Sequence, residues 1–312
     1  MTNQINRIIR QVRKFLIIKR QMNLTNNPIQ APPQPPKINC ILPPSENSQY
    51  LGNLLNNKKE NFGIEKWNDN AKFIGIFHNN KANGYGMVTF SNKDNFKGEF
   101  IDGKANGYGM YTFFSMGGVF EGYIIDDLQE TYGCEKWSDG TCYLGEYFQG
   151  KKNGLGVYVG KEGTKYYGQW KNNCFHGYGM YQIKKDKKYY GEFEMNYIHG
   201  YGEMIYGVSN SIYIGYWSRN KKEGFGLLLR KNNSKALIGF WKGNKMCGIG
   251  KTVIKNERSI YGMWKNNKME TKIFTQDEFY NILNKTYCGK YKFFFQKDYD
   301  ELETYVNIIL NS

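Results

Sequence analysis

Hydrophobic and polar side chains alternate along most of this chain. In Phe96-Lys97-Gly98-Glu99-Phe100 the rings and the glycine take every second position, and the charged residues take the positions between them. Because successive side chains of a strand point to opposite faces of a sheet, this period of two predicts a β-strand with one buried face. Gly107-Tyr108-Gly109-Met110-Tyr111-Thr112-Phe113 comes next and predicts a second strand.

Polar segments separate the predicted strands. Asn79-Asn80-Lys81-Ala82-Asn83 and Ser138-Asp139-Gly140-Thr141 contain the Asn, Asp, Ser and Gly residues that favour tight turns. A strand, a polar turn and a second strand together predict a β-hairpin.

The spacing of the glycines indicates that this hairpin is repeated along residues 50–271. A glycine that stands two positions after an aromatic or aliphatic residue recurs every 23 or 24 residues, at Gly52, Gly75, Gly98, Gly122, Gly145, Gly168, Gly191, Gly215, Gly239 and Gly262. Each of the first nine is followed 11 residues later by a second glycine, from Gly63 to Gly250. A fixed period is typical of repeat proteins. We therefore predict a mainly β fold, an elongated single-layer antiparallel array of about nine to ten hairpins, roughly 90 Å long at ~4.8 Å per strand.

Glycine weakens a strand, so its recurrence needs a cause. A position without Cβ leaves room for a large ring of the same or the adjacent hairpin to lie flat against the backbone, and we expect columns of rings over columns of glycines. Four repeats depart from the pattern. Asn61 and Thr131 replace the first glycine of a Gly-x-Gly pair, and Leu237 and Ile260 replace the leading ring; we expect looser packing there.

Residues 1–49 have a different character. The spacing of Ile5, Ile8, Ile9, Val12 and Leu16 predicts an amphipathic helix from about Gln4 to Arg20. Its basic residues are candidate contacts to an acidic partner: Arg7, Arg10, Arg13, Lys14, Lys19 and Arg20. All seven prolines fall between Pro28 and Pro44 and predict a semi-extended linker.

Residues 272–312 are predicted to be helical. Thr275-Gln276-Asp277-Glu278 has the pattern of a capping box that opens a helix through about Asn284. A second helix, from about Asp298 to Leu310, has an apolar face formed by Leu302, Tyr305, Val306 and Ile309. We expect this segment to cap the last hairpin, as an open array requires, or to dock a partner.

Composition narrows the classes of partner. The 312 residues carry a formal net charge of +15, which favours acidic partners such as nucleic acid, anionic lipid or an acidic protein surface. The basic residues are spread through the chain, which disfavours nucleic acid. No apolar run approaches the ~18 residues of a membrane span. The six cysteines contain no C-x-x-C pair, so we expect reduced thiols and no zinc site.

Catalytic patterns are absent from the sequence. Gly250-Lys251-Thr252 imitates a phosphate loop, but Lys245 stands where the motif requires its leading glycine. His176 and His199 occupy one repeat position in adjacent hairpins, about 9.6 Å apart and too far to share a zinc ion. The segments outside the array are too short for a typical enzyme domain. We expect no catalytic residue, metal, cofactor or small-molecule substrate, and therefore no enzyme.

The repeat resembles a known family. Tyr143-Leu144-Gly145-Glu146-Tyr147, followed by Gly150-Lys151-Lys152-Asn153-Gly154-Leu155-Gly156-Val157-Tyr158, is similar to a MORN (membrane occupation and recognition nexus) repeat. Tyr166, Gly168 and Trp170 with His176-Gly177-Tyr178-Gly179 resemble it more closely, and the resemblance covers about 220 residues. Similar proteins include radial-spoke-head components of cilia, cytoskeletal scaffolds of protists, membrane-junction proteins, and regulatory segments of lipid kinases and a histone methyltransferase.

The resemblance implies a non-enzymatic scaffold that bridges protein subunits of a large cytoskeletal assembly. We expect a cytoplasmic component of a ciliary axoneme, such as a radial spoke, and the richness in Asn, Lys and Ile resembles AT-rich protist coding. Two alternatives stay open. One is a peripheral tether at the cell cortex that binds anionic phospholipid through the N-terminal helix. The other is a mitochondrial assembly subunit with that helix as a targeting peptide.

Overall fold

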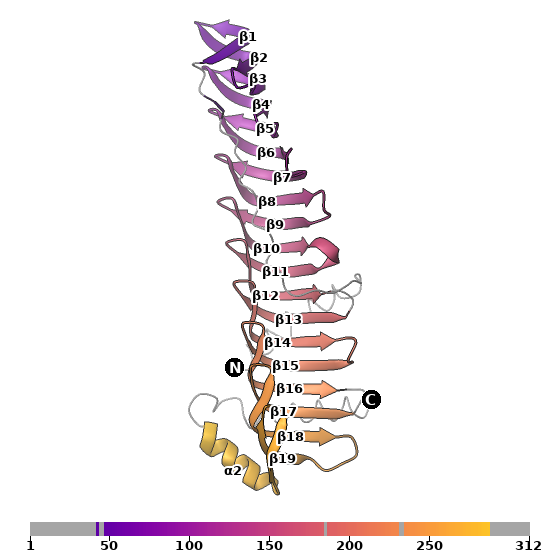
Figure 1. Cartoon of the computed structure of the whole chain (residues 1–312). Helices are drawn as coiled ribbons and strands as arrows, with labels where there is room; N and C mark the ends of the chain where they lie inside the picture. The colour runs from indigo at the N-terminus through magenta and orange to yellow at the C-terminus, as the bar shows by residue number, and fades with distance from the viewer. Residues whose placement is uncertain (1–41, 44–46, 184–185, 231–233, 288–312) are drawn as a thin grey trace. The chain divides into compact units, whose positions relative to one another are not determined.

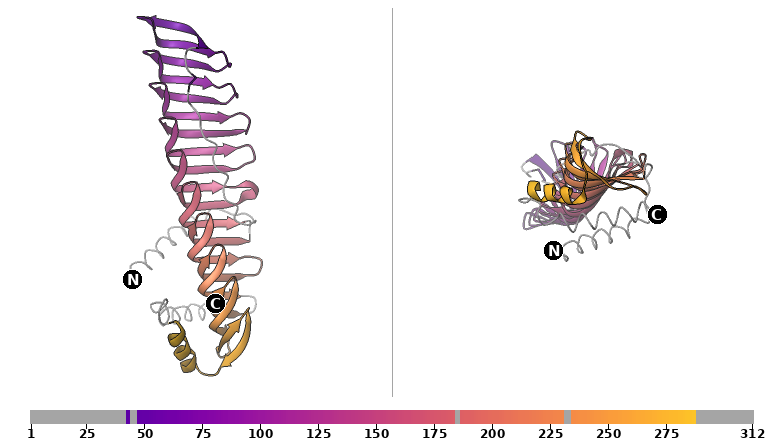
Figure 2. Two further views of the ribbon diagram at one scale, coloured as in Figure 1. Left: turned by 60° about the vertical axis from the view of Figure 1, so that its left-hand side comes forward. Right: turned by 90° about the horizontal axis from the view of Figure 1, so that it is seen from below.

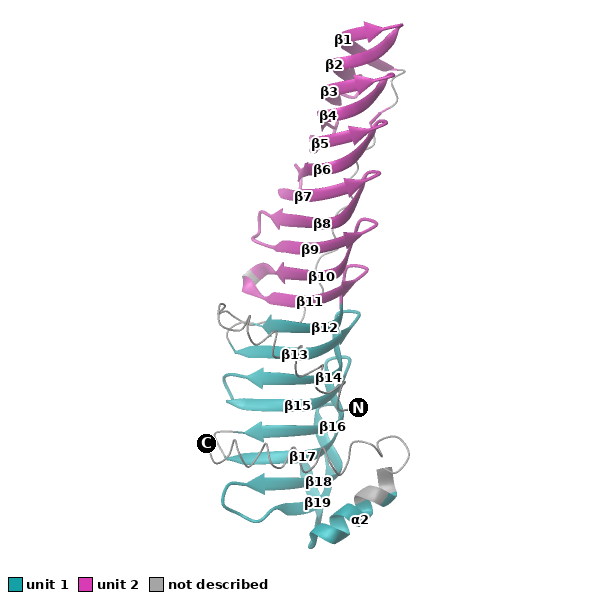
Figure 3. Cartoon of the chain, turned by 180° about the vertical axis from the view of Figure 1, so that it is seen from behind, with its two compact units in different colours: residues 1–30, 176–312 teal, residues 31–175 magenta. Residues whose placement is uncertain are grey.

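The fold is mainly β. A computed structural model describes residues 42–43, 47–183, 186–230 and 234–287. This part of the chain forms twenty β-strands, one short 3₁₀ helix and one α-helix (Figure 1). Consecutive strands form hairpins, and the hairpins follow one another side by side within each of two compact units (Figures 2 and 3).

Unit 2 comprises residues 31–175. Its strands are β1 (Ser48–Leu55), β2 (Lys58–Trp67), β3 (Lys72–His78), β4 (Lys81–Thr89), β5 (Asn95–Ile101), β6 (Lys104–Phe113), β7 (Gly118–Ile125), β8 (Leu128–Trp137), β9 (Cys142–Phe148), β10 (Lys151–Val159) and β11 (Lys165–Lys171), and the 3₁₀ helix η2 (Lys161–Gly163) precedes β11.

Unit 1 comprises residues 1–30 and 176–312. It contains most of β12 (Cys174–Ile183), then β13 (Lys187–Glu194), β14 (Tyr197–Tyr206), β15 (Ser211–Ser218), β16 (Lys221–Arg230), β17 (Lys235–Lys242), β18 (Lys245–Ile254), β19 (Ile260–Lys265), β20 (Lys268–Ile273) and the helix α2 (Gln276–Tyr287).

The register explains the two glycine spacings. Gly86 of β4 lies opposite Gly75 in its own hairpin and opposite Gly98 of β5 in the next. In unit 1, Gly202 of β14 lies opposite Gly215 of β15, which in turn lies opposite Gly226. The glycines therefore form a continuous column across the strands of each unit, and the predicted hairpin repeats are confirmed.

Of the two predicted turns, Ser138-Asp139-Gly140-Thr141 is confirmed as the connection between β8 and β9, and the turn between β3 and β4 is shorter than predicted. Asn79 and Asn80, with φ of 49° and 69°, form the whole connection between β3 and β4. Two positive φ angles in a two-residue loop define a type I′ turn, whose twist matches that of the strands. The prediction that Lys81, Ala82 and Asn83 continue the turn is wrong, because they already belong to β4.

A bulge follows each turn. The pairing of β3 with β4 shifts between Gly75 and Phe77, and Gly84 of the Gly-x-Gly pair has a φ of +108°. Asn61 and Thr131 occupy this bulge position in their repeats, with φ of 56° and 55°. Asn tolerates the left-handed region, but for a β-branched residue it is a strained conformation.

Rings cover the glycine column on the inner face. Phe73 is fully buried, and a Cβ added to Gly86 would lie 2.5 Å from its Cζ atom. The predicted nesting of rings over bare backbone is therefore confirmed. In the hairpin β17–β18 the ring is replaced by Leu237, but packing is not looser there. The fully buried Met246 fills the space, with its Cε atom 2.8 Å from the Cβ that Gly239 lacks.

The inner rings also connect one hairpin to the next. Phe73 makes edge-to-face contacts with Phe77 of its own hairpin and Phe100 of the next, each with ring centres 5.1 Å apart. Such pairs add about 0.5–1.5 kcal/mol each to the area that they bury. Ile124 replaces the second ring in the hairpin β7–β8, and it is fully buried as well.

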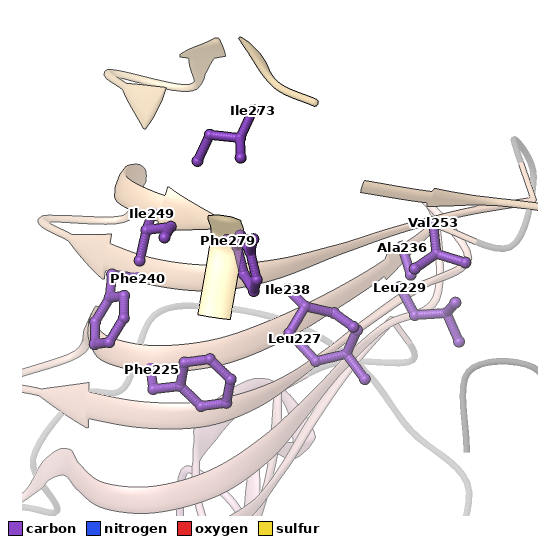
Figure 4. Close-up of a cluster of buried hydrophobic side chains, with 10 residues drawn as sticks. All are labelled: Phe225, Leu227, Leu229, Ala236, Ile238, Phe240, Ile249, Val253, Ile273 and Phe279. Carbon is purple, nitrogen blue, oxygen red and sulfur yellow. The ribbon is translucent and has the colours of Figure 1, made fainter. Parts of the chain in front are cut away.

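Helix α2 begins as the capping box predicts. The Thr275 hydroxyl accepts a hydrogen bond from the Glu278 amide at 3.1 Å. Phe279 of this helix is fully buried in a cluster with Ile238, Phe240 and Ile249 (Figure 4). Among the residues that the structure describes, no helix has the length and hydropathy of a membrane span.

Candidate functional site

The face of unit 2 opposite the rings carries an unusual number of exposed apolar side chains. Alternation along each strand places them on this face, which we call the outer face. Its exposed large side chains include Phe62, Ile76, Tyr85, Met87, Tyr108, Met110, Tyr123, Tyr132, Leu144 and Leu155. Monomeric proteins rarely expose a contiguous apolar patch larger than a few hundred Å², and larger patches mark interaction sites.

Five of these side chains share one repeat position, the middle of the Gly-x-Gly pair. Phe62, Tyr85, Tyr108, Tyr132 and Leu155 stand there in β2, β4, β6, β8 and β10, with exposed fractions of 57%, 56%, 48%, 59% and 57%. The bulge fixes their direction, because the preceding glycine, Asn61 or Thr131 turns the backbone in every repeat of unit 2. The result is one exposed apolar side chain for each hairpin, in a row across the strands.

Glutamates interrupt the apolar surface in two adjacent rows: Glu99 and Glu146 share the row of the middle Gly-x-Gly residues, and Glu121 lies in the next row, opposite Met110. The Tyr108 hydroxyl donates to Glu121 Oε1 at 2.8 Å, and the Tyr132 hydroxyl lies 3.4 Å from Glu146 Oε1. The hydrogen bond to Glu121 raises the pKa of Tyr108 above its ordinary value. Glu99 lies directly opposite Tyr85 in the register. Lys97 is the one basic residue in these two rows of the described surface, and Lys66, Lys72 and Lys136 lie in the third row of the same face. Carboxylates therefore outnumber ammonium groups only in the two rows that hold the tyrosines.

The same face of unit 1 is buried toward its C-terminal end. Phe225, Ile238 and Ile249 have exposed fractions of 6%, 0% and 0%, although they occupy the repeat positions of Tyr108, Leu144 and Leu155. They belong to the cluster that contains Phe279 of α2 (Figure 4), and this helix contacts β18, β19 and β20. Tyr201 of β14, at the repeat position of Tyr108, remains 40% exposed, so the buried part of this face does not extend to β14.

The sequence-predicted site residues lie outside the described residues. This holds for the basic set Arg7, Arg10, Arg13, Lys14, Lys19 and Arg20 and for the apolar set Leu302, Tyr305, Val306 and Ile309. Sequence reasoning missed the apolar side chains of the outer face because the outer positions of β5 hold Lys97 and Glu99, a pattern that predicts a polar surface. The signal that could have found it is the Gly-x-Gly pair, whose middle residue is aromatic or aliphatic in every repeat.

The residues with possible chemistry do not converge. His78 pairs with Glu60 at 3.2 Å and His199 with Glu194 at 3.4 Å, each within or beside its own hairpin. No group of three or more potential metal ligands occurs in the described part of the chain. Gly250-Lys251-Thr252 lies inside β18 rather than in a loop before a helix, and Lys251 is fully buried.

Two lysines at one repeat position differ in their partners. Lys152 lies on the inner face of unit 2, 4.8 Å from the centre of the Tyr143 ring, and forms an ion pair with Glu135 at 2.8 Å. Lys222 of unit 1 lies 4.7 Å from the ring centre of Tyr213 and 5.1 Å from that of Trp241. Burial, with a smaller contribution from Arg230, lowers the pKa of Lys222 to about 8.

Comparison with known proteins identifies the repeat. The family model described as the MORN repeat matches residues 50–72, 73–95, 96–115, 143–165, 166–185, 189–210, 213–235 and 238–256. Two hairpins lie outside the matches. One is β7–β8, with Thr131 at the bulge and Ile124 at the second ring position, and the other is β19–β20. A comparison with curated proteins gave no match.

A solved structure is also similar to this chain. It is the TCP domain of SAS-4 (dCPAP) from Drosophila melanogaster, in complex with a proline-rich motif of Ana2 (dSTIL). The two are 10% identical over 70% of this chain and 90% of that one, and the TM-score of 0.22 supports no functional conclusion.

The eight matches to the MORN-repeat family model cover more than half of the residues of this chain. The chain therefore belongs to the MORN-repeat family.

Proposed function

We propose that this chain is a non-enzymatic scaffold that binds partner proteins through the outer face of unit 2. The MORN repeat is a structural repeat with a scaffolding and protein-binding role. The observation that carries the proposal is the open apolar surface of β3–β10, whose counterpart on β16–β18 of unit 1 is buried. Tyr and Met are enriched in the cores of protein interfaces, and both recur on this surface.

We propose further that the partners belong to a cytoskeletal assembly, with the ciliary axoneme as the first place to look. Repeated hairpins present the same side chains at regular intervals, which suits the bridging of subunits. Residues 1–49 and 272–312, which we predict to flank the repeat array, offer two more attachment points in this proposal.

The test uses two variants of the full-length tagged chain in its own cells. Leu144→Lys places a charge on the outer face at a side chain that is 58% exposed, so the fold is expected to persist. Val208→Lys makes the same kind of change at an 82% exposed side chain of the β14–β15 loop. We expect Leu144→Lys, but not Val208→Lys, to leave the detergent-insoluble cytoskeleton. Equal retention of both would overturn the proposal.

The location of the unaltered tagged chain in the cell tests the proposed ciliary assignment. Axonemal labelling supports the ciliary assignment. Labelling of the cell cortex, together with flotation on vesicles of phosphatidylcholine and phosphatidylserine, would replace it by the membrane tether. Labelling of mitochondria would replace it by the mitochondrial subunit.

A further inference from the structure

We infer that the outer face of unit 2 binds an amphipathic α-helix of a partner protein that carries Lys or Arg next to its apolar side chains. This inference rests on the proposed function and names the chemistry of the partner for the same surface. Three observations carry it: helix α2 packs against the β18–β20 end of the corresponding face of unit 1, the spacing of the row fits a helix, and glutamates stand among the exposed apolar side chains.

Helix α2 shows how a MORN outer face is closed. Its Phe279 contacts Tyr261 with ring centres 4.9 Å apart and is buried in the cluster with Ile249 and Ile273. Tyr280 and Ile282 of the same helix pack against this cluster. The contact uses apolar side chains of a helix on the apolar face of the sheet. The outer face of unit 2 offers the same kind of surface without a covering helix among the described residues.

The spacing of the exposed row fits a helix that crosses the strands. Tyr108 and Tyr132 stand in β6 and β8, and two strand spacings of ~4.8 Å place them about 9.6 Å apart. Residues seven apart in an α-helix point in nearly the same direction and are about 10.5 Å apart. An extended segment matches poorly, because residues two apart are separated by ~6.7 Å and residues three apart point to opposite sides.

The charges of the face indicate which sign of charge the partner helix carries. Glu99, Glu121 and Glu146 stand among the apolar side chains of successive hairpins, and Lys97 is the one basic residue in the two rows of the described face that hold them. Other lysines of this face, such as Lys72 and Lys136, lie in the next row. Basic residues next to the apolar side chains of a bound helix would meet the three carboxylates, and acidic residues there would meet like charges. Helix α2 has Asp277 and Glu278 in its first turn and is therefore a natural contrast.

The chain itself supplies a probe with the required chemistry. A peptide of residues 4–20 has apolar side chains at helical spacing, six basic residues and no acidic residue. Its matched control replaces the six basic residues by glutamate. A peptide of residues 275–287 gives the natural acidic contrast.

The experiment titrates the labelled peptides with the full-length chain and follows fluorescence anisotropy. We expect saturable binding of the 4–20 peptide. We also expect about tenfold weaker binding to the variants Leu144→Lys and Glu121→Lys and unchanged binding to Val208→Lys, as for a central contact of an interface. Every titrated chain carries glutamate at the six basic residues of its own segment 4–20, because a competing intramolecular contact would weaken in the same variants and compress the ratios between them.

Three results would overturn the inference: no saturable binding of the 4–20 peptide, equal binding of the glutamate peptide, or insensitivity to Leu144→Lys and Glu121→Lys. The proposed function fails separately, when Leu144→Lys stays in the cytoskeletal fraction. If that variant leaves the fraction and the peptide does not bind, the outer face still binds a protein but not a basic helix.

Discussion

Asn173 and Lys152 are joined by two hydrogen bonds that extend the sheet into a turn. The Asn173 amide donates to the Lys152 carbonyl at 3.0 Å, and the Lys152 amide donates to Asn173 Oδ1 at 2.7 Å. Asn173 is the second residue of its type I′ turn, and Lys152 lies in the preceding hairpin. The side-chain oxygen therefore takes the place that a backbone carbonyl has in a strand ladder.

The same two-bond link recurs along both units. It joins Asn80 to Lys59, Asp127 to Ala105, Asn220 to Ile198, Asn244 to Lys222 and Asn267 to Met246. Each link ties the turn of one hairpin to the hairpin before it. The preference for Asn or Asp at the second turn position thus serves the contact between repeats as well as the turn.

Gly103→Asn should stabilise the protein. Gly103 has the same turn position with a φ of +86°, donates its amide to Ala82 at 2.8 Å, and lacks the side chain for the second bond. An added Cβ meets nothing within 4 Å. We expect about 0.5–1.5 kcal/mol more stability in urea denaturation from the new bond to the Ala82 amide. Gly140→Asn, at an equally open loop position with the same φ, controls for the loss of glycine flexibility. An equal gain in both would contradict the side-chain link.

Thr131→Gly should stabilise the protein as well. Thr131 has a φ of 55° at a bulge where Gly107 and Gly154 stand in the neighbouring repeats. Relief of the left-handed conformation is worth about 1–2 kcal/mol, less the added flexibility of glycine in the unfolded chain. The measurement is the change in Tm. Thr112→Gly, in an ordinary strand position, should lower Tm, and a lower Tm for Thr131→Gly too would show that Thr131 is not strained.

Gly86→Ala should destabilise the protein through Phe73. The added Cβ would lie 2.5 Å from Cζ and 2.7 Å from Cε2 of the Phe73 ring. Overpacking of this kind costs about 1–3 kcal/mol. A double-mutant cycle with Phe73→Leu, followed by denaturation, isolates the contact. We expect Gly86→Ala to cost less in the Phe73→Leu background, and purely additive effects would refute the ring as the cause.

Much of the fold follows from spacing alone, and much of the binding surface does not. The 11-residue offset between Gly75 and Gly86 already fixes which residues face each other in the hairpin, because pairing and alternation leave one register. The filling of a ringless repeat by Met246 could not be predicted, since that side chain comes from the turn end of the strand. Exposure is harder still, because Tyr108 and Phe225 share a repeat position, yet Tyr108 is 48% exposed and Phe225 is buried in the cluster that includes Phe279 of α2.

Lys222 should make stability depend on pH above neutrality. Its pKa of about 8 in the folded chain lies below the ordinary 10.5 of an unfolded lysine. Between these values the folded state has released the proton and the unfolded state still holds it, so the free energy of unfolding rises with pH by about 1–3 kcal/mol. Burial raises the pKa of the neighbouring Tyr206 to about 12, above this range.

The Lys222→Met variant should lack this rise in urea denaturation between pH 7.5 and pH 10, because no buried ammonium has to be deprotonated. Met204 has the same repeat position relative to Lys222 that Glu135, the ion-pair partner of Lys152, has relative to Lys152. Met204→Glu should therefore supply the missing carboxylate, raise the pKa of Lys222 and move the rise to higher pH. A wild-type profile identical to that of Lys222→Met would show that the rings around Lys222 hold its ammonium without cost.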